Sequence, residues 1–281
     1  MANVITLKLL PEQRQKLLHT FYEERSDKIP AYAEFQLRCE NCVITSYASG
    51  KVVFQGSDAE VYASPFMVQD SGMFPQAGSD EVGTGDYFGP VCVCASVVRP
   101  EDAESLRRLG VRDSKALSDS EIRKTAPELM KLLVHSLLIL PPARYNLVHA
   151  DSNMNAIKSK LHNMAYVHLR EKTELPSLIV IDQFTPEAGY YRYIASEKQI
   201  VRGIHFETKA ENKYPAVGAS SIIARYAFLR YWDEMEKQYG MTFVKGASAA
   251  VDQCARDFVS RYGKEKLGSV AKLHYKNTER I

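Results

Sequence analysis

The sequence predicts an α/β layer domain that follows a small α+β domain, and three observations predict this fold class. Beyond residue 77, short apolar runs alternate with long segments of helical period, as in helices packed on a central sheet. Before residue 65, period-two alternation prevails, which is typical of antiparallel strands. Residues 65–77 contain Pro65 and Pro75 and have no sustained period. We therefore expect domains over residues 1–64 and 78–281, joined by a linker over residues 65–77.

The first domain is expected to begin with a strand over residues 4–9 and a helix over residues 11–24. The helix has a proline in its first turn, and Leu17, Leu18 and Phe21 lie on one side of it. Three strands follow, over residues 33–39, 43–47 and 51–55. Together these segments predict a small antiparallel sheet with one face available for binding.

The second domain combines apolar strands with two long helices. Strands are expected over residues 91–98, 137–140, 178–181 and 200–206, and helices over residues 153–172 and 215–239. Cys92 and Cys94 are two residues apart in the first of these strands, so they share one face and are expected to be packing groups.

The composition excludes several classes of protein. With 45% hydrophobic and 25% charged residues, the 281-residue chain has the balance of a packed globular protein. No apolar run approaches the roughly 18 residues that span a bilayer, and no secretory leader is evident, so we expect a cytoplasmic protein without a membrane partner. The net charge of +2 excludes a chain coated in basic residues but allows a local basic face.

The five cysteines do not form the pattern of a disulfide framework, because their number is odd. Cys39 and Cys42 form a CxxC pair. A structural zinc site requires a second pair or two suitably spaced histidines, and the sequence offers neither. We therefore expect reduced thiols.

The densest concentration of functional groups lies in residues 78–90. Asp80 and Glu81 are adjacent carboxylates, and three glycines follow within seven residues. Glycines let a backbone approach a phosphate, and carboxylates tolerate that phosphate when a hard cation such as Mg²⁺ lies between them. The alternative is a glycine-rich turn with two solvated acids. The segment matches neither the phosphate-loop motif nor the dinucleotide fingerprint.

Two further acids lie at element boundaries. Asp182 ends the apolar run 178–181, where open α/β sheets present ligand groups, although a turn-forming role is the simpler interpretation. Glu211 precedes a long helix and is either a surface acid near the helix start or a member of a metal cluster. Together with Asp80 and Glu81 they supply four carboxylates from three segments, as a two-ion phosphoryl-transfer site requires.

Three other features of the sequence each allow a functional and a structural interpretation. Ser114 and Lys115 lie in a polar connector, where they contact a phosphate or simply cap the following helix. His162 lies within the helix expected over residues 153–172, where a packed or hydrogen-bonded role is favoured. Residues 253–281 carry seven Lys and Arg against three Asp and Glu, which is typical of a solvated tail or surface helix and leaves phosphate contact open.

Taken in order, these segments resemble the type 2 ribonuclease H family. The motif DEVGTG stands at Asp80–Gly85, an Asp-Ser-Lys element at 113–115, a strand-terminal aspartate at Asp182, and KAE followed by YPAVGASSIIAR at 209–225. The chain is similar to the ribonuclease HIII branch, because Thr84 stands where the ribonuclease HII branch usually has arginine. Glu211 likewise replaces the usual aspartate. The segments 28–33 and 49–56 are similar to the TATA-binding-protein-like domain of that branch.

The resemblance implies a ribonuclease H-like catalytic domain, with a central mixed sheet flanked by helices, behind a TATA-binding-protein-like domain. It implies an endonuclease that cuts the RNA strand of RNA–DNA hybrids and leaves 5′-phosphate and 3′-hydroxyl ends. Its Mg²⁺ ions, for which Mn²⁺ is a possible substitute, would be held by Asp80, Glu81, Asp182 and Glu211. The resemblance also implies that the hybrid is contacted by Gly83, Thr84, Gly85, Ser114 and Lys115.

Two alternative functions stay open. One is ribonuclease HII-like incision at single ribonucleotides in duplex DNA, and the other is hybrid binding without catalysis. No small-molecule cofactor beyond the metal is expected. A monomer is the default, because no heptad pattern is sustained.

Overall fold

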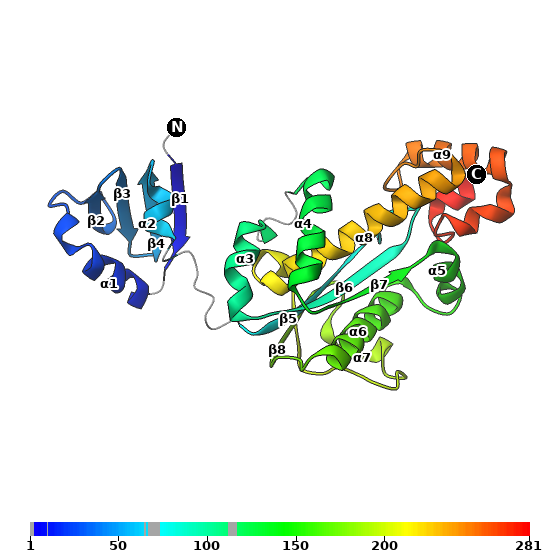
Figure 1. Ribbon diagram of the computed structural model, residues 1–281, viewed down its shortest axis with the longest axis horizontal. Helices are drawn as coiled ribbons and strands as arrows, with labels where there is room; N and C mark the ends of the chain where they lie inside the picture. Colours follow the sequence, from blue (N-terminus) through cyan, green and yellow to red (C-terminus); the bar gives the residue numbers. More distant parts are fainter. Residues whose placement is uncertain (1–2, 10, 65, 67–73, 112–116) are drawn as a thin grey trace. The chain divides into compact units, whose positions relative to one another are not determined.

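The protein is represented by a computed structural model that describes residues 3–9, 11–64, 66, 74–111 and 117–281 (Figure 1). Two compact units divide the chain, one over residues 1–72 and the other over residues 73–281. Of the linker expected over residues 65–77, residues 65 and 67–73 lie outside the described residues. No helix in the described part combines the length and apolar character that crossing a membrane requires.

The N-terminal unit is built on an antiparallel four-stranded sheet. Its strands have the order β1-β4-β3-β2 and are β1 (Asn3–Lys8), β2 (Ala33–Cys39), β3 (Cys42–Tyr47) and β4 (Lys51–Gly56). The helical segments are α1 (Pro11–Thr20), η1 (Tyr22–Glu24) and α2 (Ala59–Ala63). The expected small antiparallel sheet is therefore present, and the single helix expected over residues 11–24 is divided at Phe21.

The core of this unit lies between the helices and one face of the sheet. Leu17 of α1 packs there with strand residues that include Leu37, Ile44 and Phe54, and all four are fully buried. Phe66 joins the same cluster, so the first part of the expected linker packs with the N-terminal unit. Cys39 and Cys42 face each other across the β2–β3 hairpin as free thiols.

The second unit contains a mixed five-stranded sheet of order β7-β6-β5-β8-β9. Its strands are β5 (Gln76–Val82), β6 (Val91–Val98), β7 (His135–Leu140), β8 (Leu178–Asp182) and β9 (Ile204–Glu207). β5 runs antiparallel to β6 and parallel to β8. The expected linker end at residue 77 is two residues too late, because Gln76 and Ala77 already pair with Val98 and Val97.

Helices cover both faces of this sheet (Figure 1). One face, here called the α6 face, packs against α5 (Pro142–His149), α6 (Met154–Lys172) and α7 (Glu187–Tyr193). The opposite α8 face packs against α3 (Ala103–Arg108), α4 (Asp119–Leu132), α8 (Pro215–Tyr239) and α9 (Ala249–Tyr262). Short 3₁₀ turns are η2 (Pro100–Asp102), η4 (Ala210–Asn212), η5 (Lys264–Ser269) and η6 (Lys276–Arg280). Cys92 and Cys94 both belong to the core of the α8 face, as predicted.

The start of α8 packs very closely on β5. Gly78 permits this approach, because a Cβ atom at that position would lie 2.4 Å from the backbone nitrogen of Val217. Ser220 of α8 donates a hydrogen bond to the Gly78 carbonyl at 2.8 Å. A buried helix is thereby fixed next to the strand that carries Asp80 and Glu81.

The basic C-terminal segment over residues 253–281 is not a solvated tail. Its first part belongs to α9, a surface helix with Arg256 and Arg261 exposed, as the alternative expectation had it. Phe258, Val270 and Ala271 are fully buried in the core of the α8 face. Lys272 is also fully buried, and its Nζ donates to the carbonyl oxygens of Phe88 and Gly89 at 3.3 and 2.6 Å. The segment therefore supports the chain that follows β5.

Candidate active site

Parallel pairing brings two of the predicted carboxylates to one edge of the sheet. Ser79 of β5 is aligned with Ile181 of β8, so the next residues, Asp80 and Asp182, lie side by side at the carboxyl ends of their strands. Lys209 then takes a left-handed conformation with φ of 58°. This turn lets the Ala210 amide donate to Oδ1 of Asp182 at 3.0 Å.

Glu211 follows directly in η4 and is only 2% exposed. Its interpretation as a surface acid near a helix start is therefore wrong. It lies one residue beyond the amide that holds Asp182, so Asp80, Asp182 and Glu211 come from three segments that converge at one end of the sheet.

Asp80 lies in a buried and locally acidic environment. Its side chain accepts hydrogen bonds from the Glu81 amide, at 2.8 Å, and from Ser221 of α8. Burial, followed by the charges of Glu81 and Asp182, raises the pKa of Asp80 to about 7. The solvated-turn interpretation is wrong for this residue, which is 8% exposed within a strand.

Glu81 points to the other face of the sheet, because successive strand residues alternate. Its carboxylate lies 2.5 Å from Nζ of Lys158 and 2.8 Å from Nε2 of His162, both on α6. Burial opposes its ionisation, but the hydrogen bond and charge of His162, together with Lys158, outweigh burial and lower the pKa of Glu81. The solvated-turn interpretation is wrong here as well.

His162 connects this cluster back to β5. Its Nδ1 lies 2.7 Å from the Ser79 hydroxyl, and the ring is fully buried. The prediction of a packed, hydrogen-bonded histidine is confirmed. The role of Lys158 was not predicted, although its spacing of four residues from His162 on one helix is a signal that both face the same partner.

The donor set suits a hard divalent cation. Three buried or half-buried carboxylates, Asp80, Asp182 and Glu211, come from neighbouring segments, and the raised pKa of Asp80 indicates that negative charge is unfavourable there without added positive charge. Among the described residues, however, no three His, Cys, Asp or Glu side chains already form a metal-binding cluster.

The glycine turn, Gly83–Gly85, follows β5. Gly83 has φ of 94°, and a Cβ atom there would lie 2.1 Å from the Pro90 carbonyl oxygen, so a side chain does not fit. Gly85 is exposed, and a Cβ atom there would meet nothing within 4 Å. Thr84 lies between them with partial exposure. The turn thus has a tightly packed beginning and an open end.

Two neighbouring contacts fix the chain beyond this turn. The Gly246 amide donates to Oδ1 of Asp86 at 2.6 Å, and the Tyr87 amide donates to the Gly246 carbonyl at 2.8 Å. Ser114 and Lys115, the other predicted substrate-contacting residues, lie outside the described residues.

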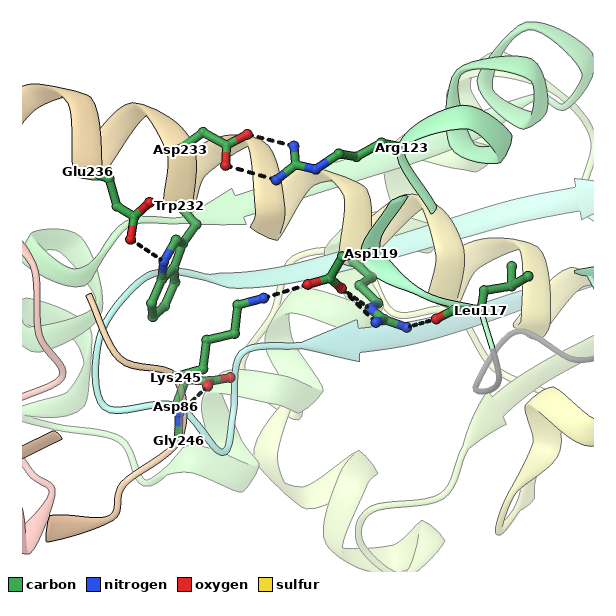
Figure 2. Close-up of polar contacts among 10 residues, drawn as sticks. Asp86, Leu117, Asp119, Arg123, Trp232, Asp233, Glu236, Lys245 and Gly246 are labelled. Carbon is green, nitrogen blue, oxygen red and sulfur yellow. Dashed lines mark hydrogen bonds and ion pairs between the residues drawn. The ribbon is translucent and has the colours of Figure 1, made fainter. Parts of the chain in front are cut away.

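An ion-pair network continues from Gly246 (Figure 2). Lys245 contacts Asp119 at 2.8 Å, and Asp119 also contacts Arg225 of α8 at 2.6 Å. Arg225 donates to the Leu117 carbonyl at 2.8 Å. The network was not predicted, because its members are far apart in sequence.

Comparisons with known proteins agree with this architecture. The ribonuclease HII family matches residues 77–278, and a domain of unknown function, DUF3378, matches residues 4–73. Ribonuclease HIII of Bacillus mycoides (strain KBAB4) is 37% identical over 100% of this chain and 98% of its own length. The chain belongs to the ribonuclease HIII family. Ribonuclease HIII of Listeria monocytogenes serotype 4b (strain CLIP80459) is 39% identical with the same coverage.

Solved structures give the same result. The crystal structure of Bst-RNase HIII in complex with Mn²⁺ matches with a TM-score of 0.75 and 34% identity, over 99% of this chain and 97% of that one. The predicted family, fold class and ribonuclease activity are therefore confirmed. The family match also extends to residue 278, well beyond residue 225, where the last recognisable motif ends.

Proposed function

We propose that this ribonuclease hydrolyses the RNA strand of RNA–DNA hybrids with two divalent metal ions, leaving 5′-phosphate and 3′-hydroxyl ends. The observation that carries the proposal is the buried Asp80 beside Asp182, with a pKa raised to about 7. A metal ion would supply the positive charge that this site needs. The complex of Bst-RNase HIII with Mn²⁺ supports metal use by a relative of the same family.

Asp80, Asp182 and Glu211 would hold the ions, and Mg²⁺ with Mn²⁺ as a substitute suits their oxygen ligands. When bound, such ions lower the pKa of an attacking water and stabilise the leaving oxygen. The protein fixes the ligands beforehand: Ser221 orients Asp80, and the Ala210 amide orients Asp182. These hydrogen bonds reduce the rearrangement that metal binding requires.

Glu81 is the fourth proposed ligand, but in this structure its carboxylate is paired with Lys158 and His162. Its carboxylate must leave Lys158 and His162 to reach an ion beside Asp80. Separating a buried ion pair costs free energy. Glu81 therefore joins the metal site only when a bound ion compensates for that loss.

The glycine turn with Ser114 and Lys115 is proposed to contact the hybrid backbone and a ribose 2′-hydroxyl. The N-terminal unit is proposed as the substrate-binding domain, and the unit that begins with β5 at Gln76 as the catalytic domain, with the linker ending before Gln76. The N-terminal sheet would act as a clamp that reads duplex shape. The five free cysteines suit a reducing, cytoplasmic location, and we propose a monomer.

The decisive experiment is cleavage of an end-labelled RNA–DNA hybrid with Mg²⁺, with Mn²⁺ and with EDTA. We expect 5′-phosphate fragments with either metal and none with chelator. A DNA duplex controls for contaminating nuclease, and a DNA duplex with one ribonucleotide tests the ribonuclease HII-like alternative. Efficient incision at the lone ribonucleotide would favour the ribonuclease HII-like alternative. Binding of the hybrid without any cleavage would favour the alternative of a non-catalytic binding protein.

A further inference from the structure

The glycine turn is held by a residue from the far end of the chain. The Tyr275 hydroxyl lies 2.6 Å from the Thr84 carbonyl oxygen, across 191 residues of sequence. The phenol must be the donor, because a carbonyl oxygen only accepts. Burial, and then the charge of Asp86, raise the pKa of Tyr275 to about 12, so the phenol keeps its proton throughout the physiological range.

This hydrogen bond determines where the next amide points. The carbonyl of Thr84 and the N–H of Gly85 belong to one planar trans peptide, so they point in opposite directions. With the carbonyl directed at Tyr275, the Gly85 N–H is directed away from Tyr275. Gly85 is exposed, and the structure gives its amide no hydrogen-bond acceptor among the described residues.

The same peptide is the part of the turn that can rotate most easily. Thr84 and Gly85 are the central residues of the turn. Turns of types I and II differ mainly by a flip of the central peptide, and glycine as the second central residue permits both. Gly83 on one side is confined by the Pro90 carbonyl, and Asp86 on the other is bound by Gly246. A flip would exchange the exposed N–H for an exposed carbonyl oxygen.

We propose that Tyr275 is a positioning residue that selects the peptide orientation in which the Gly85 N–H faces an oxygen atom of the RNA strand. An exposed carbonyl would repel the phosphate backbone, whereas an exposed N–H donates to it. The oxygen belongs either to a phosphate or to a ribose 2′-hydroxyl. This inference rests on the proposed hydrolysis of hybrids, and it gives the basic C-terminal segment a function in substrate binding.

The test compares Tyr275→Phe with a matched control, Tyr87→Phe. Tyr87 is buried with its ring centroid 6.0 Å from that of Tyr275, and its hydroxyl contacts Thr278 at 3.0 Å rather than the turn. Each variant loses one phenol hydrogen bond in the same region. Steady-state cleavage of a hybrid is measured for both, together with the melting temperature.

We expect Tyr275→Phe to raise KM for the hybrid about three- to tenfold, with kcat changed less than twofold, since a single hydrogen bond is lost. Tyr87→Phe should leave both constants unchanged, even where its melting temperature falls equally. Equal KM values for Tyr275→Phe and the wild type would overturn the inference. Cleavage by the wild type tests the proposed function separately, so the two failures are distinguishable.

Binding in EDTA identifies the oxygen that is contacted. The RNA–DNA hybrid and a DNA duplex of the same sequence are each titrated with both variants. Weaker binding of the hybrid alone by Tyr275→Phe supports the inference and identifies the 2′-hydroxyl. Equal weakening for both duplexes also supports it and identifies a phosphate. Unchanged binding of both duplexes contradicts it.

Discussion

Two neighbouring carboxylates on opposite faces of β5 have pKa values that are shifted in opposite directions. On the α8 face, Asp80 lies near other acids, and its pKa is raised to about 7. On the α6 face, Glu81 is bound by Lys158 and His162, and its pKa is lowered. The protein neutralises Glu81 with its own side chains, whereas for Asp80 we propose a metal ion as the compensating charge. Burial among like charges, more than burial alone, is therefore what supports a metal ligand at this site.

The largest expected effect comes from Asp80→Asn, which removes a charge without changing size. We expect kcat to fall about a thousandfold or more, because the carboxylate would hold a catalytic ion. The apo protein, in EDTA, should be no less stable than the wild type, since an unfavourable buried charge has been removed. Hybrid cleavage and thermal unfolding measure the two effects. Near-normal turnover would remove Asp80 from the proposed site.

Glu81→Gln should have the opposite effect on stability. The substitution leaves Lys158 buried without its carboxylate, which costs about 3–5 kcal/mol of unfolding free energy. The double variant Glu81→Gln with Lys158→Met should recover much of this loss, because no unpaired charge remains. Urea unfolding in EDTA measures both. Equal stability changes for Asp80→Asn and Glu81→Gln would show that the two faces do not differ.

Lys272 is a third buried ionisable group, and it makes stability depend on pH. Its Nζ donates hydrogen bonds to backbone carbonyl oxygens, and no carboxylate among the described residues is bonded to it. Burial lowers its pKa from 10.5 to about 7, against the opposing charge of Asp86. Between these values only the unfolded state binds the proton, so the contribution of Lys272 to stability rises with pH. Below pH 7 Lys272 is charged in both the folded and the unfolded state, so the folded protein bears the full free-energy cost of burying that charge.

We therefore expect the wild type to gain stability relative to Lys272→Met between pH 7 and pH 9, by up to about 1.4 kcal/mol per pH unit. Urea unfolding at pH 6, 7, 8 and 9 measures this difference. Lys131→Met is the control, because the Lys131 side chain is 73% exposed. A difference that does not change with pH would contradict the burial argument.

The smallest expected effect is a change in KM that distinguishes two ion pairs between α4 and α8 (Figure 2). Asp119 binds Arg225 and also Lys245, whose neighbour Gly246 holds the chain after the glycine turn. Asp233 binds Arg123 at 2.6 Å and has no second ion-pair partner among the described residues. We expect Asp119→Asn to raise KM for the hybrid about twofold, whereas Asp233→Asn leaves KM unchanged. Equal KM values for the two variants would show that the Asp119 network only holds α4 and α8 together and has no effect on substrate binding.

The sequence was most informative where local pattern and tertiary context agreed. Residues 91–98 and 215–239 were predicted to the residue, because an apolar run defines the strand, and Pro215 with Gly240 bounds the helix. β5 was not recognised as a strand, because its sequence QAGSDEV has no apolar alternation. Pairing with β6 and β8 on both sides makes it a strand, and such long-range pairing is absent from a local pattern.

The site was predicted in the same uneven way. The acids Asp80, Asp182 and Glu211 were proposed from motifs, and the structure places all three near the same end of the sheet. The partners of Glu81 could not be predicted, because Lys158 lies on a helix far along the chain and no motif joins the two. The solvated-tail interpretation of the C-terminal segment was wrong because a count of charges leaves out the apolar residues that pack in the core, such as Phe258.

The contact between Thr84 and Tyr275 can form only late in the synthesis of the chain. The 191 residues that separate them take about 10–40 s to make at bacterial translation rates of roughly 5–20 residues per second. Throughout that time Asp80 and Glu81 of β5 exist without Tyr275, the residue proposed to orient the adjacent turn. If Tyr275 positions the turn as proposed, a nascent chain would bind hybrids weakly until translation of this segment finishes.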